Sequence, residues 1–61
     1  MKVKDIIKMI QDDGWCLVRT RADHRQFHHP IKRETVTVAG KLSDELHPKT
    51  QKSILKQAGL D

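Results

Sequence analysis

Two apolar stripes with helical spacing stand at the two ends of this chain, and they constrain its fold more than any other feature. Each stripe repeats at positions i, i+3, i+4 and i+7, which predicts a helix with one buried face. The stripes consist of Val3, Ile6, Ile7 and Ile10 at one end and of Gln51, Ile54, Leu55 and Ala58 at the other. We expect the first helix over residues 2–13, ended by Gly14. We expect the second to begin at Pro48, a residue that suits the first helical position, and to stop at Gly59.

Between the two stripes the pattern changes to that of short strands. Residues 15–20 are rich in large and β-branched side chains, and residues 34–39 alternate cleanly. Residues 25–29 form a further extended run between them. The polar segments that join these runs, 21–23 and 31–33, are short, which implies that neighbouring strands are antiparallel.

The resulting order, α-β-β-β-α, predicts an α+β fold for a single domain over residues 1–61. The economical arrangement is a three-stranded antiparallel sheet with two helices on one face. A chain of 61 residues buries only roughly 60% of the surface that its unfolded form exposes, so Phe27, the only Phe, is needed in the core. Because side chains alternate along a strand, other residues must occupy the open face. These are His24, Gln26, His28, Thr35 and Thr37.

Basic residues are concentrated in the middle of the chain. The formal net charge is +4, and from Trp15 to Arg33 five arginines and lysines face one acid, Asp23. A basic segment that also carries histidines favours a polyanion such as nucleic acid as the partner. The short length leaves no room for a deep pocket, so we expect a surface site and no small-molecule ligand. Because no signal peptide and no long apolar run are present, we expect a cytoplasmic protein without membrane association.

The histidines and the single cysteine do not suggest a metal site. Cys16 alone cannot form an internal disulfide or a zinc site built on cysteines. His24 and His28 are four residues apart on one strand face, about 13 Å along it, and His29 points to the other face. No serine or cysteine has a readable neighbouring base, which argues against a catalytic triad. We therefore expect no metal and no other cofactor.

Acid–base chemistry on RNA remains as a possibility. RNA carries its own nucleophile, the 2′-hydroxyl, and an imidazole can accept or donate a proton near neutral pH. His24 would act as base or acid, and Arg21 or Arg25 would hold the phosphate. The alternative is a surface histidine in a turn with no chemical role, and the residues by themselves leave both interpretations open.

Four stretches then carry a recognisable pattern. They are residues 14–19 (GWCLVR), 23–30 (DHRQFHHP), 36–41 (VTVAGK) and 53–60 (SILKQAGL). In this order they span nearly the whole chain, and together they resemble the HicA family of toxins, from the HicA–HicB toxin–antitoxin pairs of bacteria and archaea.

The resemblance implies a fold similar to a double-stranded-RNA-binding domain. It also implies an mRNA interferase, an endoribonuclease that cleaves mRNA without the ribosome, arrests translation and is inhibited by a HicB partner. The catalytic histidine of the family matches His24, and a family Phe matches Phe27. We expect the RNA contacts around His24 to come from Arg19, Arg21, Arg25, Gln26 and His28.

The sequence departs from the family pattern near the expected catalyst. Ala22 and Asp23 stand where Gly-Ser is usual, and the Asp23 carboxylate would orient His24 or repel a phosphate. Lys49 and Gln51 replace a common glycine and a common leucine in the second helix. Two other functions use the same surface: a non-catalytic RNA-binding module, and a subunit whose basic face docks an acidic partner. We further expect HicB to mask the sheet face or its edge.

Overall fold

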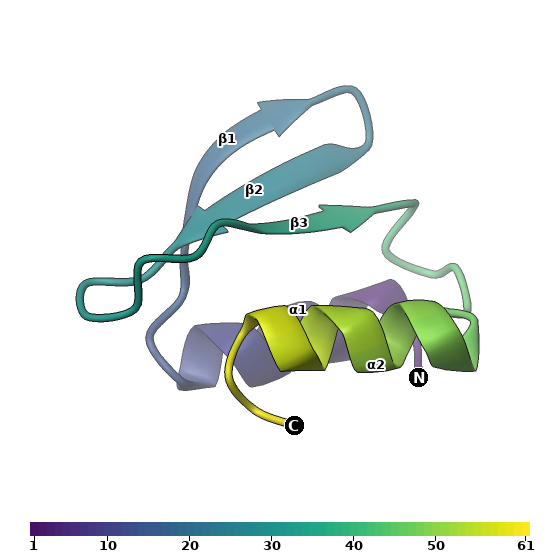
Figure 1. Cartoon of the computed structure of the whole chain (residues 1–61). Helices are drawn as coiled ribbons and strands as arrows, with labels where there is room; N and C mark the ends of the chain where they lie inside the picture. Colours follow the sequence, from purple (N-terminus) through teal and green to yellow (C-terminus); the bar gives the residue numbers. More distant parts are fainter.

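The computed structural model describes residues 1–61 and confirms the expected order of elements. Its elements are α1 (Val3–Asp12), β1 (Cys16–Arg21), β2 (His24–His28), β3 (Val36–Ala39) and α2 (Pro48–Gln57). The strands form one antiparallel sheet in the order β1-β2-β3. Both helices lie side by side under the same face of this sheet, and β1 is the strand farthest from them (Figure 1). The α+β fold class is thus confirmed.

The ten buried residues form one cluster between the sheet and the helices. All four residues of the first stripe are buried, and Phe27, Val36 and Val38 meet them from the sheet. The expected inward position of Phe27 is confirmed, since its exposed fraction is 0%. The second stripe is weaker: Ile54 and Ala58 are buried, whereas Gln51 and Leu55 are only half-buried. Full burial of a large apolar side chain stabilises the fold by about 1.5–3 kcal/mol, so this small cluster carries most of the stability.

The first hairpin is tighter than expected. The connection between β1 and β2 has only two residues, Ala22 and Asp23, because Arg21 and His24 are already paired across the strands. Ala22 has a φ of 54°, in the left-handed region that two-residue hairpins require. The tight turn therefore brings His24 into the first position of β2.

Trp15 lies just before β1 rather than within it, and it is buried. Its indole Nε1 donates a hydrogen bond to the carbonyl oxygen of Ala58 at 3.2 Å, at the end of α2. Lys32 Nζ donates to the same oxygen at 2.9 Å and to Asp13 Oδ2, at the end of α1, at 2.6 Å. These contacts join the ends of both helices to the β2–β3 loop.

His29 completes this corner of the molecule. Its Nδ1 accepts hydrogen bonds from the backbone N–H groups of Ile31 and Lys32, at 3.1 and 3.2 Å. The other ring nitrogen, Nε2, must then carry the proton, and it donates to the carbonyl oxygen of Asp13 at 2.9 Å. The edge of the ring also meets Trp15, with 5.2 Å between ring centroids. His29 is therefore a structural residue at the margin of the core.

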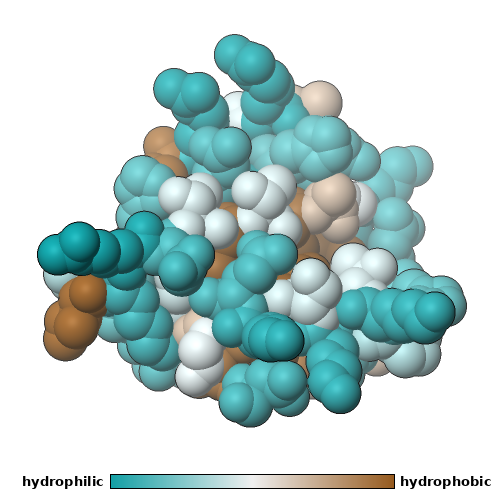
Figure 2. Space-filling view, in the orientation of Figure 1, coloured by the Kyte–Doolittle hydropathy of each residue, from teal (hydrophilic) through white to brown (hydrophobic).

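The helices do not cover the edge strand β1. None of its six residues is buried, and Leu17 and Val18 are 48% and 52% exposed. Between Leu17 and Arg19 the pairing with β2 shifts register, which makes Val18 the extra residue of a β-bulge. On the face that Figure 2 shows, polar side chains dominate, and apolar groups are visible mainly between them.

Candidate functional site

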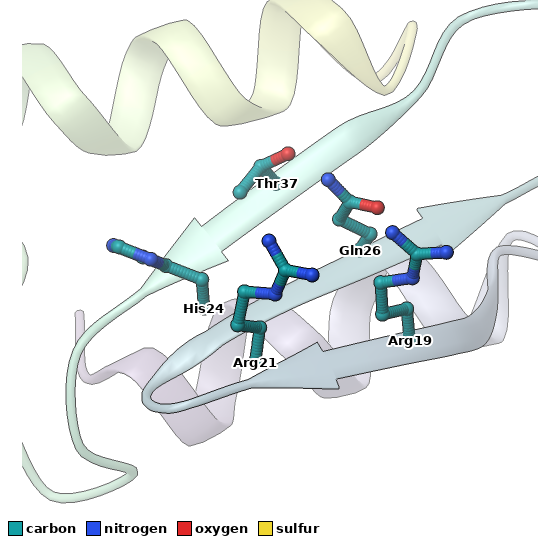
Figure 3. Close-up of a pocket in the computed structure, with 5 residues that line it drawn as sticks. All are labelled: Arg19, Arg21, His24, Gln26 and Thr37. Atoms are coloured by element: carbon teal, nitrogen blue, oxygen red, sulfur yellow. The ribbon is translucent and has the colours of Figure 1, made fainter.

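A polar pocket opens on the face of the sheet that the helices leave free. It holds about 220 Å³, and all three strands contribute to it. Its lining residues are Arg19, Arg21, His24, Gln26 and Thr37, none of them hydrophobic. Figure 3 shows the five side chains rising from the same side of the sheet, with α1 behind it and α2 beyond β3. The expectation of a polar, basic surface around His24 agrees with this arrangement.

Strand pairing explains why these residues meet. Arg21 lies opposite His24, Arg19 opposite Gln26, and Gln26 opposite Thr37. Directly opposed residues on neighbouring strands project to the same face of a sheet, with Cβ atoms about 4.5–5.5 Å apart. Each guanidinium of β1 is therefore carried next to a polar side chain of β2.

The bulge at Val18 decides which face the arginines take. Leu17 is opposite Phe27, so it belongs to the helix side of the sheet. In a regular strand Arg19, two residues further on, would share the side of Leu17. The extra residue reverses this, and Arg19 and Arg21 join His24 on the open face. This contribution of the bulge was not foreseen from the sequence.

His24 is the only pocket residue whose side chain can accept or donate a proton near neutral pH. Its side chain is 60% exposed, which leaves both ring nitrogens open to a ligand. Asp23 Oδ1 lies 3.9 Å from His24 Nε2, a loose contact between two exposed groups. Such a contact is weak in water, so the ring is free to turn toward a bound molecule.

The electrostatics of the pocket favour an anion. None of the ion pairs in the chain includes an arginine. Arg25 is the one arginine whose side chain makes a hydrogen bond within the protein. Arg19 and Arg21 thus present two unpaired guanidinium groups, and no acid lines the pocket. A guanidinium can bind two oxygens of a phosphate at once, which makes this pair suited to a phosphodiester.

Arg25 is not part of this site. It lies opposite Thr20 and Val38, and its Nη1 donates to the carbonyl oxygen of Gly40 at 2.8 Å, half-buried. The expectation that Arg25 holds the phosphate is therefore not supported by its position. The signal was in the sequence: Arg25 is two residues from Phe27, so alternation assigns both to the helix side.

His28 shares the open face but lies away from the pocket. It is opposite Cys16 at the far end of β2, and it lines a second hollow together with Thr35 and the β2–β3 loop. Thr37 is a pocket residue that we had placed on the open face without assigning it a role. Its hydroxyl can donate to a phosphate oxygen or accept from a ribose hydroxyl.

Two further features of the structure bear on the range of possible functions. No group of three or more His, Cys, Asp or Glu side chains is placed to hold a metal ion. Neither helix has the length and the apolar run that crossing a bilayer requires.

Comparison with known proteins identifies the family. No curated protein matches the chain. A family model described as the HicA toxin of bacterial toxin–antitoxin systems matches residues 3–60. The match extends over both helices, the whole sheet and all five pocket residues. The chain therefore belongs to the HicA toxin family, as the four sequence stretches had indicated.

Proposed function

We propose that this HicA-family toxin is an endoribonuclease that cleaves mRNA in the cytoplasm and so arrests translation. The observation that supports this most is the meeting of His24 with two unpaired guanidinium groups, Arg19 and Arg21, in one open polar pocket. These are the groups that phosphodiester cleavage in RNA needs, because the 2′-hydroxyl supplies the nucleophile.

The proposed reaction is an in-line attack within the RNA chain. The 2′-oxygen forms a bond to phosphorus, the bond from phosphorus to the 5′-oxygen breaks, and a cyclic phosphate and a free 5′-hydroxyl result. His24 transfers one of the two protons involved, either from the 2′-hydroxyl or to the departing 5′-oxygen. Water completes the other transfer.

Arg19 and Arg21 hold the phosphate during this reaction. Negative charge builds on the non-bridging oxygens when the fifth bond to phosphorus forms, and two guanidinium groups stabilise that charge. Gln26 and Thr37 add neutral donors beside them, suited to the ribose or to a phosphate oxygen. No step of this mechanism uses a metal ion.

The decisive experiment compares His24→Ala with His28→Ala on a long RNA. Both histidines are exposed residues of β2, but only His24 lies in the pocket. Loss of a general acid–base group slows cleavage by roughly 10²–10⁴-fold. We expect a loss of this size, and relief of growth arrest, for His24→Ala. His28→Ala should at most weaken RNA binding, and cleavage by the unaltered protein should persist in chelator. Cleavage by His24→Ala at the unaltered rate would remove His24 from the mechanism.

The second candidate function is RNA binding without cleavage. The observation that favours it is the shallow, charged surface, together with Asp23, whose carboxylate would repel a phosphate from His24. Such a module binds RNA through backbone and 2′-hydroxyl contacts, and its affinity falls with salt. A gel of purified protein with long RNA distinguishes the two functions, because only the enzyme yields shorter products.

A toxin of this kind requires an inhibitor, and we propose that a HicB-type antitoxin covers the open face at His24. Support comes from the exposure of that face and from the membership in a toxin–antitoxin family. Solvent accessibility of His24 in the complex tests this directly. A complex in which His24 remains open would require inhibition at a distance.

A further inference from the structure

We propose that the β2–β3 loop forms a second phosphate-binding subsite, which takes a phosphate of the same RNA strand some distance from the cleaved bond. We call it the distal subsite, and its residues are His28, Arg33 and Thr35. The identity of the ligand rests on the proposed function, but the site is separate from the pocket at His24.

The distal subsite is a hollow of its own at the end of β2, lined by the β2–β3 loop. It holds about 430 Å³ and is formed by residues 28–35. His28 belongs to the same strand side as His24 and Gln26, because these residues alternate along β2. From His24 to His28 the strand advances about 13 Å, at about 3.3 Å per residue. One extended nucleic-acid strand lying along β2 would therefore pass both hollows.

Arg33 is the free cation of this loop. Its neighbour Lys32 is already engaged with Asp13 Oδ2 and the Ala58 carbonyl oxygen. Arg33 is exposed and has no ion pair or side-chain hydrogen bond. The backbone N–H groups of Arg33, Glu34 and Thr35 likewise donate to no backbone acceptor. An unpaired guanidinium beside unpaired N–H groups is an arrangement that binds a phosphate.

The loop is held in place before any ligand arrives. His29 accepts the N–H groups of Ile31 and Lys32, and Lys32 is tied to the ends of both helices. These contacts fix the backbone immediately before Arg33. A preorganised loop loses little conformational entropy on binding, so a single exposed arginine can contribute measurable affinity.

An apolar side chain lines the same hollow as this cation. Ile31 is 85% exposed, the highest value among the large hydrophobic residues. Figure 2 shows apolar atoms projecting at the margin where Figure 1 draws the β2–β3 loop. Ile31 is not part of the hydrophobic core. A bound nucleotide could place its phosphate at Arg33 and the apolar surface of its sugar or base against Ile31. Glu34 lines the same hollow, and its carboxylate lowers the affinity for a phosphate that Arg33 can provide.

The test is a phosphate-neutralisation scan on a short single-stranded RNA. In His24→Ala, which keeps the substrate intact, one phosphate at a time is replaced by an uncharged methylphosphonate, and binding is measured. We expect affinity to fall at two separated positions, one for each hollow. Adding Arg33→Ala should lower affinity for the unmodified RNA about threefold to tenfold. At one of the two positions the methylphosphonate should then no longer change the affinity. Arg33→Lys should retain most of the affinity and the sensitivity at both positions.

Lys8→Ala is the matched control, because Lys8 is an exposed cation of α1 on the opposite layer. It should leave the scan unchanged. In addition, Arg33→Ala should reduce the slope of log affinity against log salt by about 0.7, the value for one phosphate contact on a single strand.

The outcomes separate this inference from the proposed function. A single sensitive position, or a scan that Arg33→Ala leaves unaltered, overturns the distal subsite and leaves the enzyme proposal standing. Cleavage by His24→Ala overturns the catalytic assignment. The scan is then run on a 2′-O-methyl RNA, which lacks the nucleophile and stays intact, and it tests Arg33 in the same way. Absence of any RNA binding overturns both.

Discussion

Replacing His29 by alanine should destabilise the protein strongly, whereas the same change at the adjacent His28 should not. His29 donates one hydrogen bond to Asp13 and accepts two from the β2–β3 loop, and its ring edge packs against Trp15. His28 is exposed on the open face and makes none of these contacts. The pair is a matched test of the difference between a structural and a surface histidine.

The expected magnitude follows from these contacts. A hydrogen bond contributes about 0.5–1.5 kcal/mol net, and the two N–H groups that share Nδ1 count as little more than one. The aromatic edge contact adds about 0.5–1.5 kcal/mol. His29→Ala should therefore cost roughly 2–4 kcal/mol, compared with a free energy of unfolding of about 3–9 kcal/mol for 61 residues. His28→Ala should stay within about 0.5 kcal/mol.

Urea denaturation measures both variants. Far-ultraviolet circular dichroism provides the free energy of unfolding, because the fluorescence of Trp15, the only Trp, is affected directly by the loss of the His29 ring. In a thermal scan His29→Ala should melt roughly 8–30 °C lower. His29→Phe, which keeps the ring contact and loses the hydrogen bonds, should fall between the two. Equal stability of the His28 and His29 variants would refute the structural role of His29.

Two further predictions concern the same corner of the molecule. The hydrogen bond from Lys32 and the positive charge of Lys32 hold the pKa of Asp13 below its ordinary value of 3.8, against a smaller opposing effect of desolvation. The resulting stabilisation is present above pH 3.8 and disappears as the pH falls through the lowered pKa. Urea titrations at acidic pH should therefore show a steeper loss of stability than for Asp13→Asn, and parallel curves would argue against the pair. Gly14→Ala should destabilise by about 1–3 kcal/mol, because Gly14 has a φ of 114° and an added Cβ would lie 2.8 Å from His29 Nε2. Combined with His29→Ala the cost should shrink in a thermal scan, since the clash is then removed; an unchanged cost would assign the effect to the backbone alone.

The candidate catalytic pocket and the structural corner lie on different sides of the sheet. The pocket residues project from one face, while the corner formed by Trp15, His29 and Lys32 joins the helices to the end of β2. His24→Ala should therefore spare stability, and His29→Ala should lower activity chiefly by unfolding. This separation makes the two histidine assignments independent of each other.

The sequence by itself determined the elements and their order. The stripe from Val3 to Ile10 has a strict helical period, and any compact fold must bury it. Alternation around Phe27 was equally decisive, and it placed His24 and Gln26 on the open face. Alternation of Val36 and Val38 placed Thr37 on the same face. The same rule, applied to Arg25, would have assigned that arginine to the helix side. These properties depend on residues a few positions apart, which is the range over which periodicity carries information.

Only the tertiary structure decided the register and the corner contacts. The bulge at Val18 turns Arg19 toward His24, and it is set by how β1 aligns with β2 rather than by any local pattern. The two-residue turn at Ala22 contains neither glycine nor asparagine, the residues from which such a turn is usually predicted. Likewise Trp15 bonds to Ala58, which lies 43 residues away in the chain. Such contacts depend on which distant segments pack together. The periodicity of a single sequence reports only on residues a few positions apart, so it does not predict this packing.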